Sequence, residues 1–146
     1  MFGIAPRFHI TGLIGHIAVS FLVPSTLVLA YRFEPQVVLD ALLEHRPTCT
    51  VGAITAFTAL LDSPQFTQDH FSSFTSVYSG RAAISPTAER AFLEATGKRV
   101  HNAYGLTETT SPLTVTPFGA SSPVDPHLRC PLGRCPRPEH DRADPG

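Results

Sequence analysis

Short apolar runs alternate along the chain with segments in which apolar residues recur at helical spacing. The apolar run at residues 26–30 is followed by an amphipathic segment that opens at Glu34 and Pro35 and stops before Pro47. A short run with β-branched residues and no polar alternation is typical of a strand buried on both faces. Strands that alternate with helices are joined by right-handed crossovers, so the pattern predicts an α/β fold with a parallel sheet and flanking helices.

The same alternation continues through the middle of the chain. We expect helices at residues 9–21, 34–46, 54–61 and 86–96, and strands at residues 26–30, 49–51, 74–78 and 99–103. The last helix has clear boundaries, because Ser85 and Pro86 suit its N-terminus and Gly97 suits a left-handed C-cap. Ligands of parallel sheets bind at the carboxyl ends of strands, so a binding loop is expected after Ala103.

The composition is that of a soluble globular domain. The chain has 146 residues, of which 42% are hydrophobic and 16% charged, and its formal net charge is -1. Without a basic footprint, no nucleic-acid partner is expected. The three cysteines, Cys49, Cys130 and Cys135, lack the spacing of a disulfide framework, which favours a reducing compartment and predicts a cytoplasmic protein. The last two are not expected to form a zinc site.

The almost continuous apolar run at residues 10–31 also allows a signal-peptide or membrane interpretation. Pro24 and Ser25 split the run, and His9 and His16 lie at its start and inside it. Each piece is shorter than the roughly 20 residues that a membrane span needs. A buried helix followed by a buried strand accounts for the same residues, so no transmembrane segment is predicted. His16 is expected to be a core residue rather than a metal ligand.

A cluster of different functional groups follows the predicted strand at residues 99–103. Tyr104 offers a flat ring on which a purine can stack, and Gly105 lets a ligand approach the backbone. The Thr107 hydroxyl can bond phosphate or carboxylate oxygens, and Glu108 is a hard oxygen ligand suited to Mg²⁺. From spacing alone, a solvated turn without a ligand is the somewhat better interpretation.

Three motifs that occur in a fixed order favour a ligand-binding site over a solvated turn. The chain contains, from its start, APRFHITGL, VYSGRAAISP and HNAYGLTETTSP. Together they resemble the adenylate-forming superfamily, which includes acyl-CoA synthetases, 4-coumarate CoA ligases, firefly luciferase and nonribosomal-peptide adenylation domains. The resemblance extends over about residues 4–124 and implies a fragment of the large N-terminal domain of such an enzyme.

The resemblance assigns roles to individual residues of these motifs. It implies that Asn102 bonds the purine edge and that Tyr104 stacks on adenine. It also implies that Thr107 contacts the phosphate and acyl carboxylate and that Glu108 coordinates Mg²⁺. The nucleotide and acyl pockets would be lined by Gly80, Arg81, Ala82, Ala103 and Gly105. His9 would gate the acyl and CoA side of the pocket.

Two positions depart from the motifs of the family. Arg81 stands where the family usually has a second glycine, and Arg7 replaces the usual leucine before His9. A side chain as large as that of Arg81 can project into the nucleotide pocket. We therefore predict that Arg81→Gly tightens ATP binding, which titration calorimetry would measure. For His9, capping of the following helix is the alternative to a gating role.

The function implied by the resemblance is activation of a carboxylic acid by ATP, through an acyl-adenylate, followed by transfer to CoA. A fatty acid is the expected substrate, with ATP, Mg²⁺ and CoA as cofactors. The phosphate loop and the C-terminal domain with its adenylation lysine are not recognisable, so the chain alone is expected to be inactive. A fragment of an aromatic-acid or other adenylating enzyme is one alternative. A non-catalytic pseudogene product or interaction module is the other.

The C-terminal part of the chain differs from the rest. We expect a partial AMP-binding domain at residues 1–120 and a disordered tail at residues 121–146. The tail is rich in proline and arginine and has no hydrophobic period, so it cannot bury enough apolar surface to fold. A shifted reading frame would produce such a tail.

Overall fold

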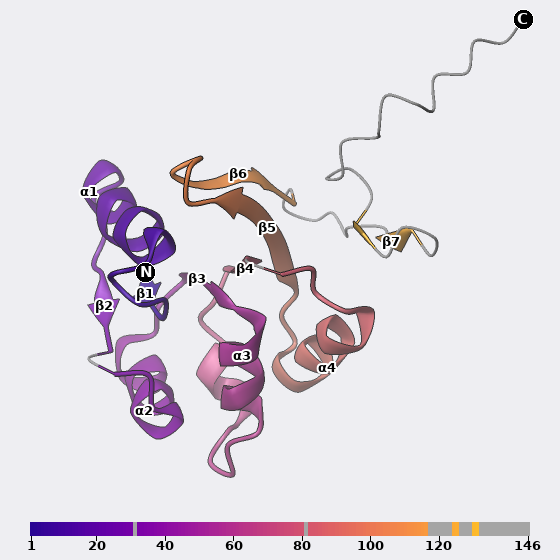
Figure 1. The fold of residues 1–146 in the computed structure, drawn as a ribbon. Helices are drawn as coiled ribbons and strands as arrows, with labels where there is room; N and C mark the ends of the chain where they lie inside the picture. The colour runs from indigo at the N-terminus through magenta and orange to yellow at the C-terminus, as the bar shows by residue number, and fades with distance from the viewer. Residues whose placement is uncertain (31, 81, 117–123, 126–129, 132–146) are drawn as a thin grey trace, which may run out of the picture.

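The computed structural model describes residues 1–30, 32–80, 82–116, 124–125 and 130–131. Within these residues the main sheet has six strands in the order β2-β1-β3-β4-β5-β6 (Figure 1). They are β1 Phe2–Gly3, β2 Val28–Leu29, β3 Cys49–Ala53, β4 Ser76–Gly80, β5 Val100–Leu106 and β6 Ser111–Val115. The first five run parallel, and β6 pairs antiparallel with β5. The predicted α/β fold with a parallel sheet is therefore confirmed.

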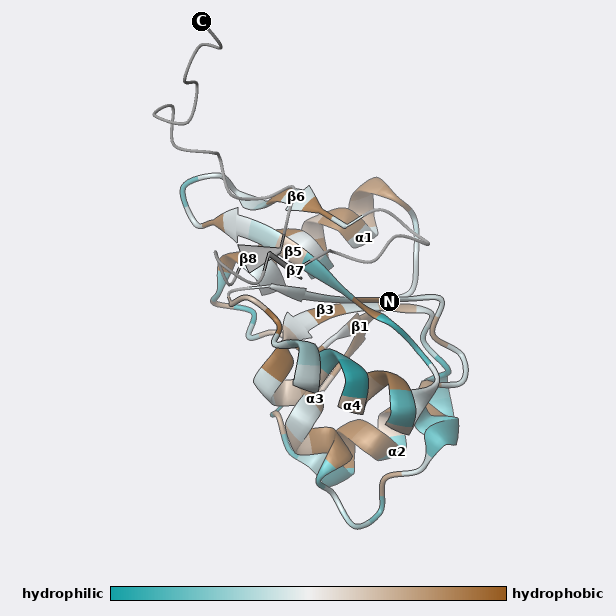
Figure 2. Cartoon of the chain, turned by 90° about the vertical axis from the view of Figure 1, so that its right-hand side faces the viewer, coloured by the Kyte–Doolittle hydropathy of each residue, from teal (hydrophilic) through white to brown (hydrophobic). Residues whose placement is uncertain are grey.

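The helices lie on both sides of this sheet. They are η1 Thr11–Ala18, a π-helix, then α1 Val19–Leu22, α2 Pro35–His45, α3 Ile54–Leu61, the 3₁₀-helix η2 Gln68–Phe71, and α4 Pro86–Thr96. Three of them, α2, α3 and α4, cover one face of the sheet, whereas η1 and α1 lie on the other (Figures 1 and 2). No helix in the described parts of the chain is long and apolar enough to cross a membrane.

The best predicted element is α4, whose bounds match residues 86–96. The Ser85 hydroxyl accepts a hydrogen bond from the backbone N–H of Ala88 at 3.1 Å, and Pro86 occupies the first turn. At the other end, Gly97 has a φ of 69° and its N–H donates to the carbonyl of Leu93 at 2.8 Å. Both ends follow from local chemistry, which is why the sequence reveals them.

The hydrophobic core lies between the sheet and α2, α3 and α4. Phe2, Thr50, Val77 and Val100 are paired in register across β1, β3, β4 and β5. Thr50 is tolerated in this row because its hydroxyl donates to the carbonyl of Phe2 at 2.9 Å. The fully buried aromatic side chains of the core are Phe2, Phe57, Phe71, Phe74 and Phe92.

Two expectations about buried elements are wrong. The predicted strand at residues 26–30 is only Val28–Leu29, at the edge of the sheet, and Leu29 is 43% exposed. The helical segment predicted at residues 9–21 ends at Leu22, and Phe21 is 83% exposed. Figure 2 shows the hydrophobic colour of α1 on the outer side of the molecule.

The binding loop expected after Ala103 is a β-hairpin instead. β5 continues to Leu106, and the chain turns and returns as β6. The sequence hides β6 because Pro112, which lacks an N–H, lies inside it, and proline is tolerated only in edge strands. β1 was also missed, since Phe2–Gly3 is too short to show a pattern.

Most of the predicted tail lies outside the described residues. Within it, β7 Val124–Asp125 pairs antiparallel with β8 Cys130–Pro131. Arg81 also lies outside the described residues, as does Cys135.

Candidate functional site

A cavity of about 570 Å³ lies at the carboxyl ends of β3, β4 and β5, next to the start of η1. Its size is within the usual range of small-molecule pockets, and its position is the one expected for a ligand of a parallel sheet. The predicted site residues that line it are His9, Gly80, Ala103, Tyr104, Gly105, Thr107 and Glu108. These residues come from three separate motifs, which the fold brings together around one space.

Two of the predicted site residues, Asn102 and Ala82, do not line this cavity. Arg81 lies outside the described residues, so its predicted place in the pocket stays a prediction. Asn102 is half-buried in β5 opposite Ser79, and its carbonyl accepts a hydrogen bond from the N–H of Thr116 at 3.0 Å. Its predicted contact with a purine stays a prediction.

The β5–β6 hairpin positions the aromatic, hydroxyl and carboxylate groups of the site. Its turn is held by Thr109, whose hydroxyl accepts from the N–H of Leu106 at 3.0 Å. A β-bulge interrupts the pairing between Tyr104 and Gly105. A side chain at Gly105 would collide with the backbone of Ser111, so the two strands can approach this closely only with glycine there.

The hairpin also contains strained backbone. Thr110 has a φ of 58° and Ser111 a φ of 88°, in the left-handed region that residues other than glycine seldom occupy. Such strain persists only where the surrounding structure enforces it, and it is enriched at functional sites. Thr110 lies in the turn directly after Thr107 and Glu108, so the strain is next to the candidate site.

Two cavity residues present groups that are available to a ligand. The Tyr104 side chain is 47% exposed at the cavity wall, and its ring makes no stacking contact with another described aromatic ring. Glu108 is exposed and forms no ion pair within the described residues. A flat free ring suits a purine, and one free carboxylate suits Mg²⁺ that keeps waters and phosphate oxygens as its other ligands.

His9 has a structural role in addition to its place in the cavity wall. Its Nδ1 accepts a hydrogen bond from the backbone N–H of Thr11 at 3.2 Å, at the start of η1. The capping role considered from the sequence is therefore present. Because Nδ1 is an acceptor in this bond, the proton of the neutral ring is assigned to Nε2, which leaves that atom as a donor. The gating role of His9 stays a prediction.

The described wall of the cavity has one acidic side chain and no basic one. Among the described residues that line it, Glu108 is the one carboxylate and there is no lysine or arginine. No cluster of three or more histidine, cysteine or acidic residues suited to a metal exists in the described chain. The described lining residues therefore fit adenine and one metal ligand, and they include no cation for a triphosphate.

Two buried polar side chains have no hydrogen bond of ordinary geometry within the described structure. They are His16, on η1 and only 1% exposed, and Ser111, which lines the cavity at the start of β6. Burial lowers the pKa of His16 to about 4, and a polar contact with the Val51 backbone opposes this only in part. His16 is thus a neutral core residue at pH 7, as predicted.

His101 is buried in β5 on the same side of the sheet as Tyr78, with ring centroids 5.6 Å apart. Burial lowers its pKa, as does nearby Arg99, while Glu89 opposes them. His101 is a strand residue, as predicted.

Part of the cavity wall was not identified from the sequence. It includes Ile4 to Pro6, which follow β1, the end of β3 at Val51 to Ala53, and Phe33. The segment at β3 could have been found, because it also follows a strand at the edge where ligands bind. The contribution of Ile4 to Pro6 depends on β1, for which there was no usable signal.

The fold and the cavity define a class of α/β protein with a small-molecule cavity at the carboxyl edge of a parallel sheet. Comparison with known proteins narrows the class: residues 1–139 match the family described as AMP-binding enzyme. The chain belongs to this family. The resemblance to the adenylate-forming superfamily is therefore confirmed.

Individual relatives agree with this assignment. The chain is 33% identical over 143 residues to a long-chain-fatty-acid–CoA ligase of Bacillus subtilis (strain 168), a match that covers 97% of this chain and 24% of that protein. The ATP-bound crystal structure of MatB from Rhodopseudomonas palustris is 27% identical with a TM-score of 0.74, covering 89% of this chain and 24% of that one.

A third relative is the anthranilate CoA ligase AuaEII in complex with anthranoyl-AMP. It is 25% identical with a TM-score of 0.75, over 84% of this chain and 24% of that one. The chain thus spans 24% of the length of each of these three relatives. A fragment of the N-terminal domain of an acyl- or aryl-CoA ligase fits these matches.

Proposed function

We propose that the chain is the central part of the large domain of an ATP-dependent fatty acid–CoA ligase that acts through an acyl-adenylate in the cytoplasm. The observation that carries the proposal is the cavity at the strand ends, where His9, Tyr104, Thr107 and Glu108 meet. The name of the Bacillus subtilis relative supports a fatty acid and CoA as substrates, and the ATP-bound MatB structure supports ATP.

Each cavity residue has a proposed task. Tyr104 holds adenine by stacking against its ring, and Gly80 and Gly105 leave room for the nucleotide to approach the backbone. Thr107 donates its hydroxyl to an oxygen of the phosphate or acyl carboxylate. Glu108 contributes a carboxylate to Mg²⁺, which neutralises phosphate charge when it is bound. His9 borders the acyl side.

We expect this chain alone to bind a nucleotide without turning over substrate. Attack of a carboxylate on a phosphate brings two anions together, which requires cations or preorganised donors. The described cavity wall has neither lysine nor arginine. Loss of one preorganised donor alone reduces turnover by about 100-fold or more. A ligase assay with ATP, CoA and a fatty-acid panel would contradict this expectation if it detected acyl-CoA.

Calorimetric titration of the chain with AMP, with and without MgCl₂, tests the site directly. We expect Tyr104→Ala to weaken AMP binding by about 10- to 100-fold, because stacking of a base on an aromatic ring is worth roughly 1–3 kcal/mol. Leu113→Ala is the matched control, since Leu113 is an exposed residue of the same hairpin that does not line the cavity. Equal affinity in both variants, or no binding by the unaltered chain, would support the non-catalytic alternative.

An aromatic acid is the second candidate substrate, favoured by the structural similarity to the anthranilate CoA ligase AuaEII. Non-hydrolysable acyl-adenylate analogues distinguish the two without requiring turnover. We expect the dodecanoyl sulfamate of adenosine to bind more tightly than the benzoyl sulfamate. The reverse order would replace the fatty acid by an aromatic acid in the proposal.

A further inference from the structure

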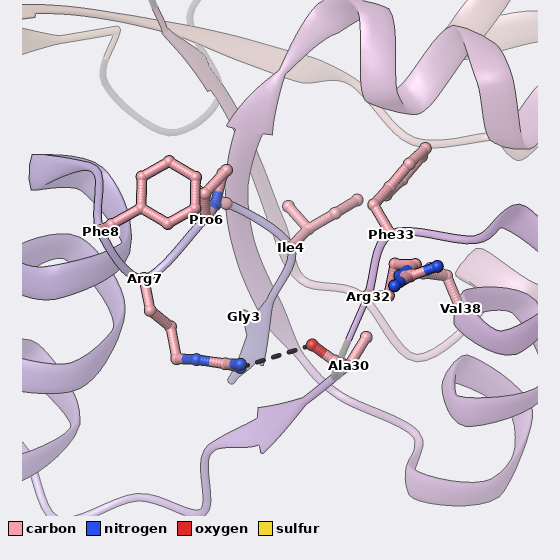
Figure 3. Close-up of a pocket in the computed structure, with 10 residues that line it drawn as sticks. Gly3, Ile4, Pro6, Arg7, Phe8, Ala30, Arg32, Phe33 and Val38 are labelled. Atoms are coloured by element: carbon pink, nitrogen blue, oxygen red, sulfur yellow. Dashed lines mark hydrogen bonds between the residues drawn. The ribbon is translucent and has the colours of Figure 1, made fainter.

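A second, smaller pocket of about 290 Å³ lies between the end of β1, the end of β2 and the start of α2. Figure 3 shows its lining residues, with Ile4 at the centre and Phe33 and Val38 on the side of α2. Ile4, Ala5, Pro6 and Phe33 also line the large cavity. The two pockets therefore share a wall, which is formed by the segment that follows β1 and by Phe33.

The interior of this pocket is apolar. Ile4, Ala30 and Phe33 contribute hydrocarbon surface to it. The described residues that line it include no carboxylate. This surface suits a short hydrocarbon group rather than a sugar or an inorganic ion.

Two arginines complete the pocket from different segments of the chain. Arg7 follows β1 and reaches toward β2, where its Nη1 lies 3.5 Å from the carbonyl oxygen of Ala30, at the limit of a hydrogen bond (Figure 3). Arg32 lies after β2, beside Val38 in this view. Both side chains are exposed, and neither forms an ion pair with a described residue.

Two other arginines of the chain, unlike Arg7 and Arg32, lie within ion-pair distance of an acidic side chain. Arg46 pairs with Asp69 at 3.2 Å, and Arg99 lies 3.7 Å from Glu89. At the small pocket, two guanidinium groups adjoin one apolar cavity, and the described part of its lining holds no acidic side chain to neutralise them. Guanidinium groups bind carboxylates through paired N–H donors, so this arrangement favours an organic anion.

We propose that the small pocket binds an aliphatic carboxylate, with the carboxylate between Arg7 and Arg32 and the hydrocarbon chain against Ile4, Ala30 and Phe33. A volume of about 290 Å³ corresponds to about ten water molecules, so the pocket has room for a carboxylate with a short or medium hydrocarbon chain. This site is separate from the acyl-adenylate site proposed above and does not require a nucleotide.

Titration of the full 146-residue chain with hexanoate tests this proposal, with chemical shifts of a ¹⁵N-labelled sample as the readout. We expect saturable binding that shifts the amide signals of Gly3, Ala30 and Val38. The double variant Arg7→Gln/Arg32→Gln should bind about tenfold more weakly or worse, since hydrogen bonds to charged groups are lost. Arg90→Gln is the matched control, because Arg90 is exposed on α4 and also forms no ion pair with a described residue.

Two further ligands separate the charge of hexanoate from its hydrocarbon part. Hexanol should not bind, because it lacks the carboxylate. Inorganic phosphate should bind more weakly than hexanoate, because it leaves the apolar wall unused. Equal binding of phosphate and hexanoate would overturn the proposal, as would unchanged hexanoate binding by the double variant.

Hexanoate binding at the small pocket can be tested independently of AMP binding in the large cavity. Tyr104→Ala should leave hexanoate binding unchanged, and AMP should not displace hexanoate. Displacement by AMP, with shifts at Gly105 rather than Val38, would place hexanoate in the large cavity and overturn the proposal. Absence of AMP binding with retained hexanoate binding would overturn only the nucleotide site. The same unfolding midpoint for all variants confirms that they are folded.

Discussion

The face of the sheet under α2, α3 and α4 buries a cluster of phenylalanine rings, whereas η1 on the other face buries the polar side chain of His16. On the helical face, Phe92 lies 5.3 Å from Phe71 and 5.7 Å from Phe57, measured between ring centroids. On the other face, His16 and Ser111 are buried without a hydrogen bond of ordinary geometry among the described residues. The first arrangement stabilises the fold, and the second leaves polar groups that a binding site can use.

The two faces also differ in exposed apolar surface, since Phe21 on α1 is exposed whereas Phe92 is fully buried. Backbone with positive φ at non-glycine residues occurs at Thr110 and Ser111 in the hairpin, and on the aromatic face at Arg46, which ends α2. Stability is therefore expected to reside in the aromatic face, and function at the hairpin.

Removal of an aromatic ring from the helical face should have the largest effect. Phe92→Ala is expected to lower the free energy of unfolding by about 3–5 kcal/mol, because it leaves a cavity beside the rings of Phe57 and Phe71. Leu93→Ala, at a partly exposed position of the same helix, should cost about 1 kcal/mol or less. Urea unfolding followed by circular dichroism measures both. Equal losses would show that the aromatic face is not the main source of stability.

Burial of His16 on the other face should make stability depend on pH. Its pKa is about 4 in the folded chain and 6.5 in the unfolded chain, so the unfolded state binds the proton first as pH falls. Above pH 6.5 the neutral His16 does not destabilise the fold. As the pH falls from 6.5 toward 4, the free energy of unfolding decreases by about 3 kcal/mol. Unfolding free energies measured at intervals between pH 7 and pH 4 would follow this loss.

The variant His16→Leu isolates that contribution, because leucine is buried without a charge to lose. We expect its stability to fall less than that of the unaltered chain over the same pH interval. His45→Leu serves as control, since the His45 side chain is 44% exposed. If both variants kept the pH dependence of the unaltered chain, the buried imidazole would not be its cause.

A change in the hairpin should have the smallest effect on stability but a clear effect on the site. Gly105→Ala places a methyl group against the backbone of Ser111, which must move, at a cost of about 1–3 kcal/mol. Because the same movement displaces Tyr104, AMP binding should weaken as well. Gly15→Ala is the control, since its added methyl would make only ordinary contacts of 3.5 Å or more. Thermal unfolding and calorimetry give the two readouts.

Elements that are defined by interactions between residues close in the sequence could be predicted. Features that depend on contacts between distant segments could not. α4 and α3 were predicted with their observed bounds, because proline, glycine and apolar spacing act within a few residues. The exposure of Leu29 in β2 and of Phe21 could not be predicted, because it depends on which distant segments of the chain pack against them. The hairpin was missed because positive φ at Thr110 and Ser111 has no signature in those residue types.

The candidate site shows the same division. The functional groups of Tyr104, Thr107 and Glu108 can be recognised in one short motif, and the sequence also predicts that this motif follows a strand. Their convergence with His9 and Gly80 on one cavity is a property of the parallel sheet, which brings the carboxyl ends of distant strands to one edge. The placement of Asn102 outside that cavity likewise follows from the register of β5 against β4.

By itself, the sequence determined the alternation of helices and strands, the caps of α4 and the family motifs, because these reside in local residue chemistry. Only the tertiary structure decided which face of the sheet carries the aromatic core and that Arg7 and Arg32 adjoin a second pocket. It also decided that His16 is buried without a hydrogen bond of ordinary geometry among the described residues. Those outcomes depend on contacts between segments that lie far apart in the chain, and the free energy of such contacts is realised only when the segments pack together.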